Sequence, residues 1–286
     1  MKSKILLFGL LASLMFVSCS KNEDAVVEDT FSLEEGNVNA KIDIITDDIC
    51  KVVEDQLTLA DGISGRSAAG VDSFLPACAT ITRVPDIGTM PTVGDLITKT
   101  IDFGTIGCPL PNGNILKGKI VITFVYQPTA VSHSINYSFV NFYHNNTKIT
   151  GNKSFTRVLS VATASSPSHP IVTMNLDITI TLADGRVFTR TGTRVREIIE
   201  GYGTLVLNDN VYKVTGNWTT TFPNSSVQTS TITTPLIIKL NCNNITKGII
   251  TFVRNSRTAT LDYGDGTCDN QAIFTVNGVP RTITLN

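Results

Sequence analysis

The stretch that decides the fold is Pro170 to Leu182, PIVTMNLDITITL, in which apolar and polar residues alternate. Every second residue is apolar: Val172, Met174, Leu176, Ile178, Ile180 and Leu182. Successive side chains of a strand point to opposite faces, so an alternation of period two places all the apolar ones on one face. The pattern therefore predicts a β-strand with one buried face and one solvated face.

The residues around this strand predict an antiparallel meander. Asp184-Gly185 separates it from a second strand-like run, Arg186 to Glu197, and predicts a hairpin turn with positive φ at both central residues. Asn145-Asn146, Asn208-Asp209 and Asn277-Gly278 predict similar turns. About a dozen strand candidates follow at hairpin spacing without alternating helices, so we expect a mainly β chain in a curled sheet, sandwich or barrel.

One segment before the strands has a helical period instead. Residues 38–58 carry apolar side chains at steps of three and four: Val38, Ile42, Ile45, Ile49, Val52, Val53 and Leu57. This spacing predicts one N-terminal helix with one apolar face, begun by Asn37 or Asn39 and closed near Gly62. We expect residues 37–286 to form a single β-rich domain that starts with this helix.

The first eighteen residues have the layout of a secretory signal peptide. Lys2 and Lys4 precede an uncharged apolar run, Ile5 to Val17, which ends at Ser18-Cys19. The run is too short to cross a bilayer, which takes about 20 helical residues. We therefore expect residues 1–18 to be removed on export.

Phe16-Val17-Ser18-Cys19 resembles the lipobox of bacterial lipoproteins, in the relaxed form common in Bacteroidota. The resemblance implies a diacylglyceryl group on the Cys19 sulfur and hence a lipid anchor in the outer membrane. Residues 19–36 are acidic and poor in apolar side chains, which predicts a disordered tether. Ser20 to Asp24 resembles the acidic signal that sends such lipoproteins to the cell surface; the alternative is the periplasmic face. An ordinary signal peptide, with Cys19 in a disulfide, is the competing interpretation.

The net charge excludes one class of partner. Without Lys2 and Lys4 the mature chain holds 21 basic and 24 acidic residues, which argues against binding to nucleic acid. The partners expected are the membrane, through the anchor, and an unidentified protein, glycan or lipid ligand. No cofactor is expected.

The cysteines stand in a frame that occurs twice. Cys78 and Cys242 are each followed by Ile-Thr at the third and fourth positions, and Cys108 and Cys268 each follow an Asp-aromatic-Gly triplet. This repetition predicts the disulfides Cys78–Cys108 and Cys242–Cys268, each closing a loop of about 30 residues. Cys50 is then left as an unpaired thiol, which we expect to be buried.

Five short motifs stand out along the chain: Leu261 to Asn270 (LDYGDGTCDN), Ile101 to Gly104, Lys117 to Ile120, Ile149 to Gly151 and Thr234 to Leu236. Together they resemble a family of Bacteroidota lipoproteins to which no activity is assigned. The resemblance covers residues 38–286, and the C-terminal motif is its most specific part. It implies an envelope location and the β fold, without a reaction.

Two charged groups are candidate sites. Asp262, Asp265 and Asp269 could surround calcium, although their spacing differs from an EF-hand loop and turns explain the residues equally well. Four arginines share one strand face by parity and could bind an anion: Arg186, Arg190, Arg194 and Arg196. We expect them instead on the solvated face of the sheet, paired with groups such as Asp177.

No catalytic motif stands out. The three histidines, His133, His144 and His169, are too far apart in sequence to indicate a local metal site. The sequence contains no H-E-x-x-H, G-x-S-x-G, P-loop or G-x-G-x-x-G pattern. The leading hypothesis is a non-catalytic envelope lipoprotein with a structural or binding role. The alternatives are a carrier of an apolar ligand inside a curled sheet, and a hydrolase or glycan-active enzyme with a site assembled from several strands.

Overall fold

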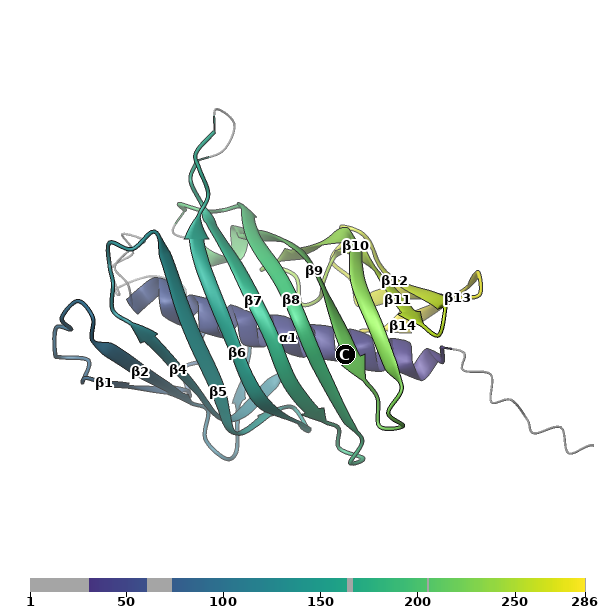
Figure 1. The fold of residues 1–286 in the computed structure, drawn as a ribbon, viewed down its shortest axis with the longest axis horizontal. Coiled ribbons are helices and arrows are strands. Elements are labelled where there is room, and N and C mark those ends of the chain that lie inside the picture. The colour runs from purple at the N-terminus through teal and green to yellow at the C-terminus, as the bar shows by residue number, and fades with distance from the viewer. Residues whose placement is uncertain (1–30, 61–73, 164–166, 205, 286) are drawn as a thin grey trace, which may run out of the picture.

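The computed structural model describes residues 31–60, 74–163, 167–204 and 206–285. It contains one long helix, α1 (Leu33–Ala60), and a sheet that follows it in the chain (Figure 1). The strands are β1 (Thr80–Val84), β2 (Leu96–Asp102), β3 (Cys108–Pro109), β4 (Ile115–Val125), β5 (Ser132–His144), β6 (Thr147–Leu159), β7 (Pro170–Thr181), β8 (Val187–Glu200), β9 (Val211–Thr221), β10 (Val227–Lys239), β11 (Lys247–Arg254), β12 (Arg257–Asp265), β13 (Gln271–Val276) and β14 (Val279–Thr284).

All fourteen strands belong to one antiparallel sheet. Each strand pairs with its neighbours in the chain, except that the short β3 pairs with β4 and leaves β2 beside β4. The sheet curls without closing, so β1 and β14 remain its edges (Figure 1). The predicted antiparallel meander is confirmed, and of the three architectures expected it is the curled sheet that forms.

The strand that predicted the fold has the expected burial. In β7, five alternate side chains are buried on the concave face: Val172, Met174, Leu176, Ile178 and Ile180. The residues between them lie on the convex face, where Asn175 and Asp177 are exposed and Thr173 and Thr179 are half-buried. The polar convex face and the apolar concave face explain why the sheet curls around a core.

The turn after β7 differs from the prediction. Gly185 has φ +86°, but Asp184 is not among the residues with positive φ. The Leu182 amide instead donates to the Arg186 carbonyl over 2.9 Å, which makes a loop of three residues rather than two. Such loops need a single left-handed residue, and glycine takes that conformation at little cost.

Two other predicted turns have different outcomes. Asn277 and Gly278 both have positive φ, 52° and 75°, as their two-residue hairpin requires. Asn208-Asp209 does not form a hairpin turn and lies in a short 3₁₀ helix, Leu207–Asp209, within the longer connection from β8 to β9.

Helix α1 starts before its predicted boundary. The Ser32 hydroxyl accepts from the Glu35 amide over 3.1 Å, and Glu35 Oε2 accepts from the Ser32 amide over 2.8 Å. This reciprocal capping box satisfies two amides that have no partner within the helix. Ser32 therefore caps the helix in place of Asn37 or Asn39, and residues 33–36, expected in the tether, are helical. The predicted end at Gly62 lies outside the described residues.

The strands and the loops between them bury the central part of α1 on all sides. Residues 42–53 are buried without exception, a run of more than three helical turns. Figure 1 shows the helix crossing the concave side of the strands along the length of the sheet. The predicted apolar face of the helix is buried, and its polar face is buried as well, which creates the main electrostatic feature of the molecule.

Candidate functional site

Asp43, on α1, is the centre of a buried polar cluster. It accepts hydrogen bonds from Arg190 Nη1 over 2.6 Å, from Arg194 Nη2, and from the Tyr263 hydroxyl over 3.1 Å. Asn39, one helical turn earlier, accepts from Arg190 Nη2 over 3.0 Å. A buried carboxylate is stable only with such partners, so α1 is held in one position along β8 and β12.

A second ion-pair group lies further along the helix. Arg196 Nη1 donates to Asp47 over 2.5 Å, and its Nε lies 3.2 Å from Glu54. Lys51 lies 2.8 Å from Asp47. Burial opposes ionisation of Asp47, but Lys51 and Arg196 outweigh it and lower the pKa of that carboxyl. Burial raises the pKa of Glu54. We call Asp43, Asp47, Glu54, Arg190, Arg194 and Arg196 the interior ion network.

The arginines rest on aromatic rings of the next strand. The Arg194 and Arg190 guanidinium carbons lie 4.2 and 5.0 Å from the centre of the Trp218 ring. The Arg196 guanidinium carbon lies 3.7 Å from the Tyr212 ring. Cations are attracted to the faces of aromatic rings, most strongly where water is excluded. The aromatic rings of β9 and the carboxylates of the helix therefore together surround the buried guanidinium groups.

Glycine allows the two strands to approach at this point. A Cβ on Gly192 would lie 2.4 Å from the Trp218 Cα, so no other residue fits without moving the strand. Gly192 and Trp218 are register partners between β8 and β9. The tight contact places the Trp218 ring next to the arginines that flank Gly192 in the chain.

The prediction of a solvated arginine face is wrong for three of the four residues. Arg190, Arg194 and Arg196 are 0%, 3% and 3% exposed and face the helix. Asp177, the expected partner, lies on the opposite face, next to Thr191. The alternation along β8 does place the arginines on one face, but that face is the concave one. Arg186 alone is partly exposed, with Glu34 and Asp184 as partners.

Asp48 forms a separate polar centre on the same helix. His144 Nε2 lies 2.8 Å from Asp48 Oδ2, and the amides of Asn112 and Asn114 donate to the same carboxylate over 2.8 to 3.1 Å. The side chains of Asp48 and His144 are 1% and 2% exposed. The centre joins α1 to β5 and to the loop before β4.

A buried amine lies next to the unpaired thiol. Lys153 is 2% exposed, its Nζ has no hydrogen-bond partner among the described residues, and it lies 5.7 Å from the Tyr137 ring centre. Burial lowers the pKa of Lys153 to about 8. Cys50 is buried outside any disulfide and contacts Met174, and burial raises the pKa of its thiol to about 12. A thiol that stays protonated is a weak nucleophile.

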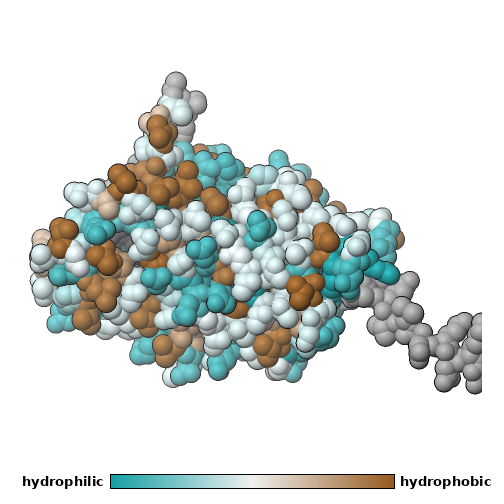
Figure 2. Space-filling model, in the orientation of Figure 1, coloured by the Kyte–Doolittle hydropathy of each residue, from teal (hydrophilic) through white to brown (hydrophobic). Residues whose placement is uncertain are grey.

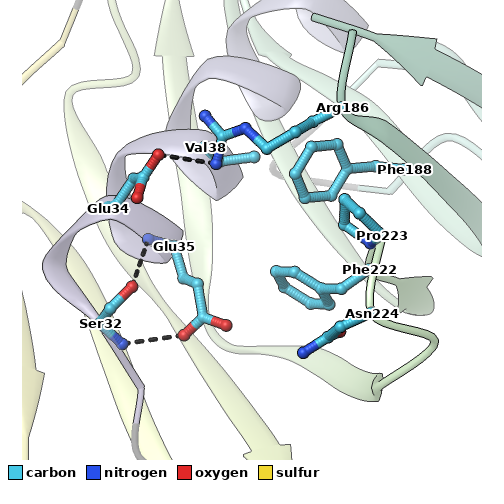
Figure 3. A pocket seen from close by; sticks show the side chains of 9 residues that line it. All are labelled: Ser32, Glu34, Glu35, Val38, Arg186, Phe188, Phe222, Pro223 and Asn224. Atoms are coloured by element: carbon cyan, nitrogen blue, oxygen red, sulfur yellow. Dashed lines mark hydrogen bonds and ion pairs between the residues drawn. The ribbon is translucent and has the colours of Figure 1, made fainter. Parts of the chain in front are cut away.

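The structure has a surface hollow at the start of α1, of about 230 Å³. Figure 3 shows Phe188, Phe222 and Pro223 on one side of it and the first turn of the helix on the other. Glu34 and Glu35, at the helical side, are engaged by Arg186 and Arg254. The hollow is small, and its charged groups are already paired within the protein.

The two predicted disulfides, Cys78–Cys108 and Cys242–Cys268, are confirmed. The duplicated frame around them is a structural repeat: Asp102 Oδ1 and Asp262 Oδ1 each accept the amide of the glycine two residues later over 2.9 Å. The aromatic residues between, Phe103 and Tyr263, are both buried. The tyrosine differs by contributing its hydroxyl to Asp43.

Each of the three carboxylates considered for calcium accepts hydrogen bonds within the turn in which it lies. Asp262, Asp265 and Asp269 each accept the backbone amide two residues later, and Asp265 also accepts from the Thr267 hydroxyl. Within the described ranges, no three metal-ligating side chains converge. Cys19, the predicted lipidation site, lies outside the described residues.

The interior ion network fits a structural role better than a chemical one. Its carboxylates and guanidinium groups neutralise each other and are shielded from water, so a substrate cannot reach them without displacing α1. The sequence contains one signal for it: Asn39, Asp43 and Asp47 recur every four residues on the helix, and the arginines recur on one strand face. Nothing in the sequence indicates that the two rows meet.

No family model, no curated protein and no solved structure matches the chain. No helix among the described residues is long and apolar enough to span a membrane.

Proposed function

We propose that this chain is an exported, lipid-anchored envelope lipoprotein with a non-catalytic structural or binding role at the outer membrane, displayed at the cell surface. The observation that supports this most directly is the way α1 fills the concave side of the sheet. Residues 42–53 of the helix are buried, with Asp43 and Asp47 paired with arginines of β8 and Asp48 with His144 of β5. The groups at the centre of the domain thus serve to stabilise its own fold.

The disulfides are consistent with export. Two disulfides are expected in an oxidising compartment and are rare in the cytosol. One joins the segment before β1 to β3, and the other joins the β10–β11 loop to the β12–β13 loop. Together with the lipobox-like sequence at Cys19, they support membership of the lipoprotein family that the C-terminal motif resembles.

The alternatives receive less support. A carrier needs an apolar cavity, and the place where a curled sheet would hold its ligand is occupied by α1. An enzyme whose site lies inside the curled sheet needs acids or a histidine that a substrate can reach, whereas the acids and the histidine that meet there, Asp43, Asp47, Asp48 and His144, are buried. We therefore keep the non-catalytic role as the proposal.

The proposal is tested by labelling cells that express the chain with a fatty-acid analogue. The wild type and Cys50→Ser should incorporate the label and fractionate with the outer membrane, and Cys19→Ser should do neither. An unlabelled wild type, or a labelled Cys19→Ser variant, would overturn the anchor. Replacing Lys21 to Asp24 with neutral residues should reduce digestion by protease added to intact cells; unchanged digestion would contradict the surface signal.

A further inference from the structure

One row of side chains crosses the convex face of the sheet from β2 to β13. Its members are register partners on successive strands, so the pairing of the strands defines the row independently of residue type. All eleven are threonine, asparagine or serine, and each is exposed or half-buried: Thr98, Thr123, Asn136, Ser154, Asn175, Thr193, Asn217, Thr231, Thr251, Thr260 and Thr275. We call these residues the polar row. At about 4.8 Å between strands, the row is roughly 50 Å long.

The neighbouring row, two residues along each strand, is nearly as uniform. Register partners place in it Thr82, Thr100, Val121, Ser138, Asn152, Asp177, Thr191, Thr219, Thr229, Val253 and Thr258. Charged residues make up 16% of the chain, which would give about three or four among the 22 positions of the two rows, but Asp177 is the only one there. In Figure 2 the middle of the molecule, where Figure 1 places β6 to β9, is mainly pale or teal, the colours of residues of intermediate or low hydropathy.

Strand propensity alone does not account for the missing charges. Threonine favours strands, but the exposed face of a sheet also accommodates pairs of opposite charge on adjacent strands. Such a pair lies on the same face of this sheet beyond the two rows, where Lys213 Nζ is 2.5 Å from Glu197 Oε2. The fold therefore tolerates charges on its convex side, and the uncharged rows are a property of this part of the surface.

Side chains of the polar row hydrogen-bond to one another. Asn175 Nδ2 donates to Ser154 Oγ over 3.2 Å, and the Thr193 hydroxyl donates to Asn175 Oδ1 over 3.3 Å. These bonds orient the groups at the middle of the row. Hydroxyl and amide groups both donate and accept, so the row offers both kinds of partner to a ligand along its length.

The composition of the two rows indicates which ligand fits this face. The rows hold no Lys or Arg to neutralise phosphates, which argues against nucleic acid. Protein interfaces have an apolar centre, whereas the two valines, Val121 and Val253, lie far apart on β4 and β11. A neutral polysaccharide presents hydroxyl groups along an extended chain, and these donate and accept as the groups of the rows do. Because the sheet curls, a flexible chain can follow the row.

We propose that the polar row binds a neutral, hydroxyl-rich polysaccharide that lies across the strands. This inference rests on the binding role proposed above and names the class of its ligand. Hydrogen bonds between uncharged groups contribute little each in water, and neither row supplies an aromatic ring for a sugar to stack on. Binding therefore depends on many contacts at once and strengthens with the length of the polysaccharide.

The test uses the mature full-length chain with Cys19→Ser, so that no acyl chain contributes. Its retardation is measured in native gels that contain a soluble neutral polysaccharide, mannan in one gel and xyloglucan in another. At least one of the two should retard the chain. A tetrasaccharide of the same sugars should compete far more weakly than the polymer at equal mass.

Adding Thr193→Val, Thr231→Val and Thr251→Val should weaken the affinity about tenfold or more, because three hydroxyl groups are lost while side-chain shape and strand propensity are kept. The matched control makes the same change at three exposed threonines of the loops, Thr89, Thr105 and Thr129, and should bind as the parent does. Equal melting temperatures would show that both variants are folded.

Unchanged mobility of the parent in both gels would overturn the proposal, and so would equal retardation of the two triple variants. A tetrasaccharide that competes as well as the polymer would indicate a compact site and would also overturn the row. The fatty-acid labelling and protease digestion above report on the anchor and the display independently. A labelled, protease-sensitive chain without retardation would leave the lipoprotein standing and remove the polysaccharide, and the reverse result would do the opposite.

Discussion

Asp43 and Arg190 form an ion pair of 2.6 Å in the interior, and both side chains are 0% exposed. The carboxylate comes from the helix and the guanidinium from β8, which are separated by 147 residues in the chain. The pair therefore joins the first element of the domain to the middle of the sheet. Its removal should show how far the fold depends on buried charge.

Asp43→Asn should lower the free energy of unfolding by about 3–5 kcal/mol, because it leaves Arg190 and Arg194 buried without their carboxylate. The matched control is Asp177→Asn, the same change on the exposed convex face, which should stay within about 0.5 kcal/mol of the wild type. Denaturant unfolding of both variants checks this. Similar small losses in both would show that the interior ion network contributes little to stability.

Tyr263→Phe tests the aromatic position of the repeated frames, which is Phe103 in the first frame and Tyr263 in the second. It removes the hydroxyl that donates to Asp43 and should cost about 2 kcal/mol, as expected for a buried bond to a charged group. The reciprocal Phe103→Tyr adds a hydroxyl among apolar residues and should also destabilise, by roughly 1–3 kcal/mol. Thermal unfolding of the two variants measures both effects. A neutral Tyr263→Phe would contradict the hydrogen bond.

Because of Lys153, the free energy of unfolding should rise with pH between two values. These are the pKa of this lysine in the folded protein and its pKa in the unfolded chain. Burial lowers the folded pKa from 10.5 to about 8, so between these values the unfolded chain binds more protons than the folded one. Lys153→Met should abolish this rise and stabilise the protein near pH 7 by on the order of 3 kcal/mol.

The measurement is the difference in unfolding free energy between Lys153→Met and the wild type from pH 7 to pH 9. Taking the difference separates the effect of Lys153 from that of Cys50. The raised pKa of the Cys50 thiol makes the free energy of unfolding fall with pH above the ordinary pKa of a thiol. Lys153→Arg keeps the charge, which cannot be lost at these pH values, and should show no rise. A difference independent of pH would contradict the assignment.

Each disulfide should contribute about 3–4 kcal/mol in the chain-entropy model. Replacing either pair by serine, Cys78 with Cys108 or Cys242 with Cys268, should lower the melting temperature in the absence of reductant.

Cys50 should react with an alkylating reagent only after unfolding, because it is buried. Peptide mapping without reductant that links Cys50 to one of the four would refute the pairing.

Much of the architecture is local and could be read from the chain. The alternation from Val172 to Ile180 predicted a half-buried strand, and Asn277-Gly278 predicted a hairpin turn, because both depend on residues adjacent in sequence. The helix boundary was missed by five residues. The only apolar residue in the Ser32–Glu35 capping box is Leu33, which is exposed and stands outside the apolar spacing that begins at Val38, so the hydrophobic period did not reach the box.

The sequence by itself determined the pairing of the disulfides, whereas only the tertiary structure decided the burial of the arginines. The duplicated frame allowed the pairing to be predicted because both cysteines of each pair belong to one repeated unit. Arg190, Arg194 and Arg196 were placed on a common strand face by parity, but parity does not say which face is concave. Only the curling of the sheet around α1 set Asp43 and Asp47 against that face, since a charged row is buried or solvated according to whether distant opposite charges meet it.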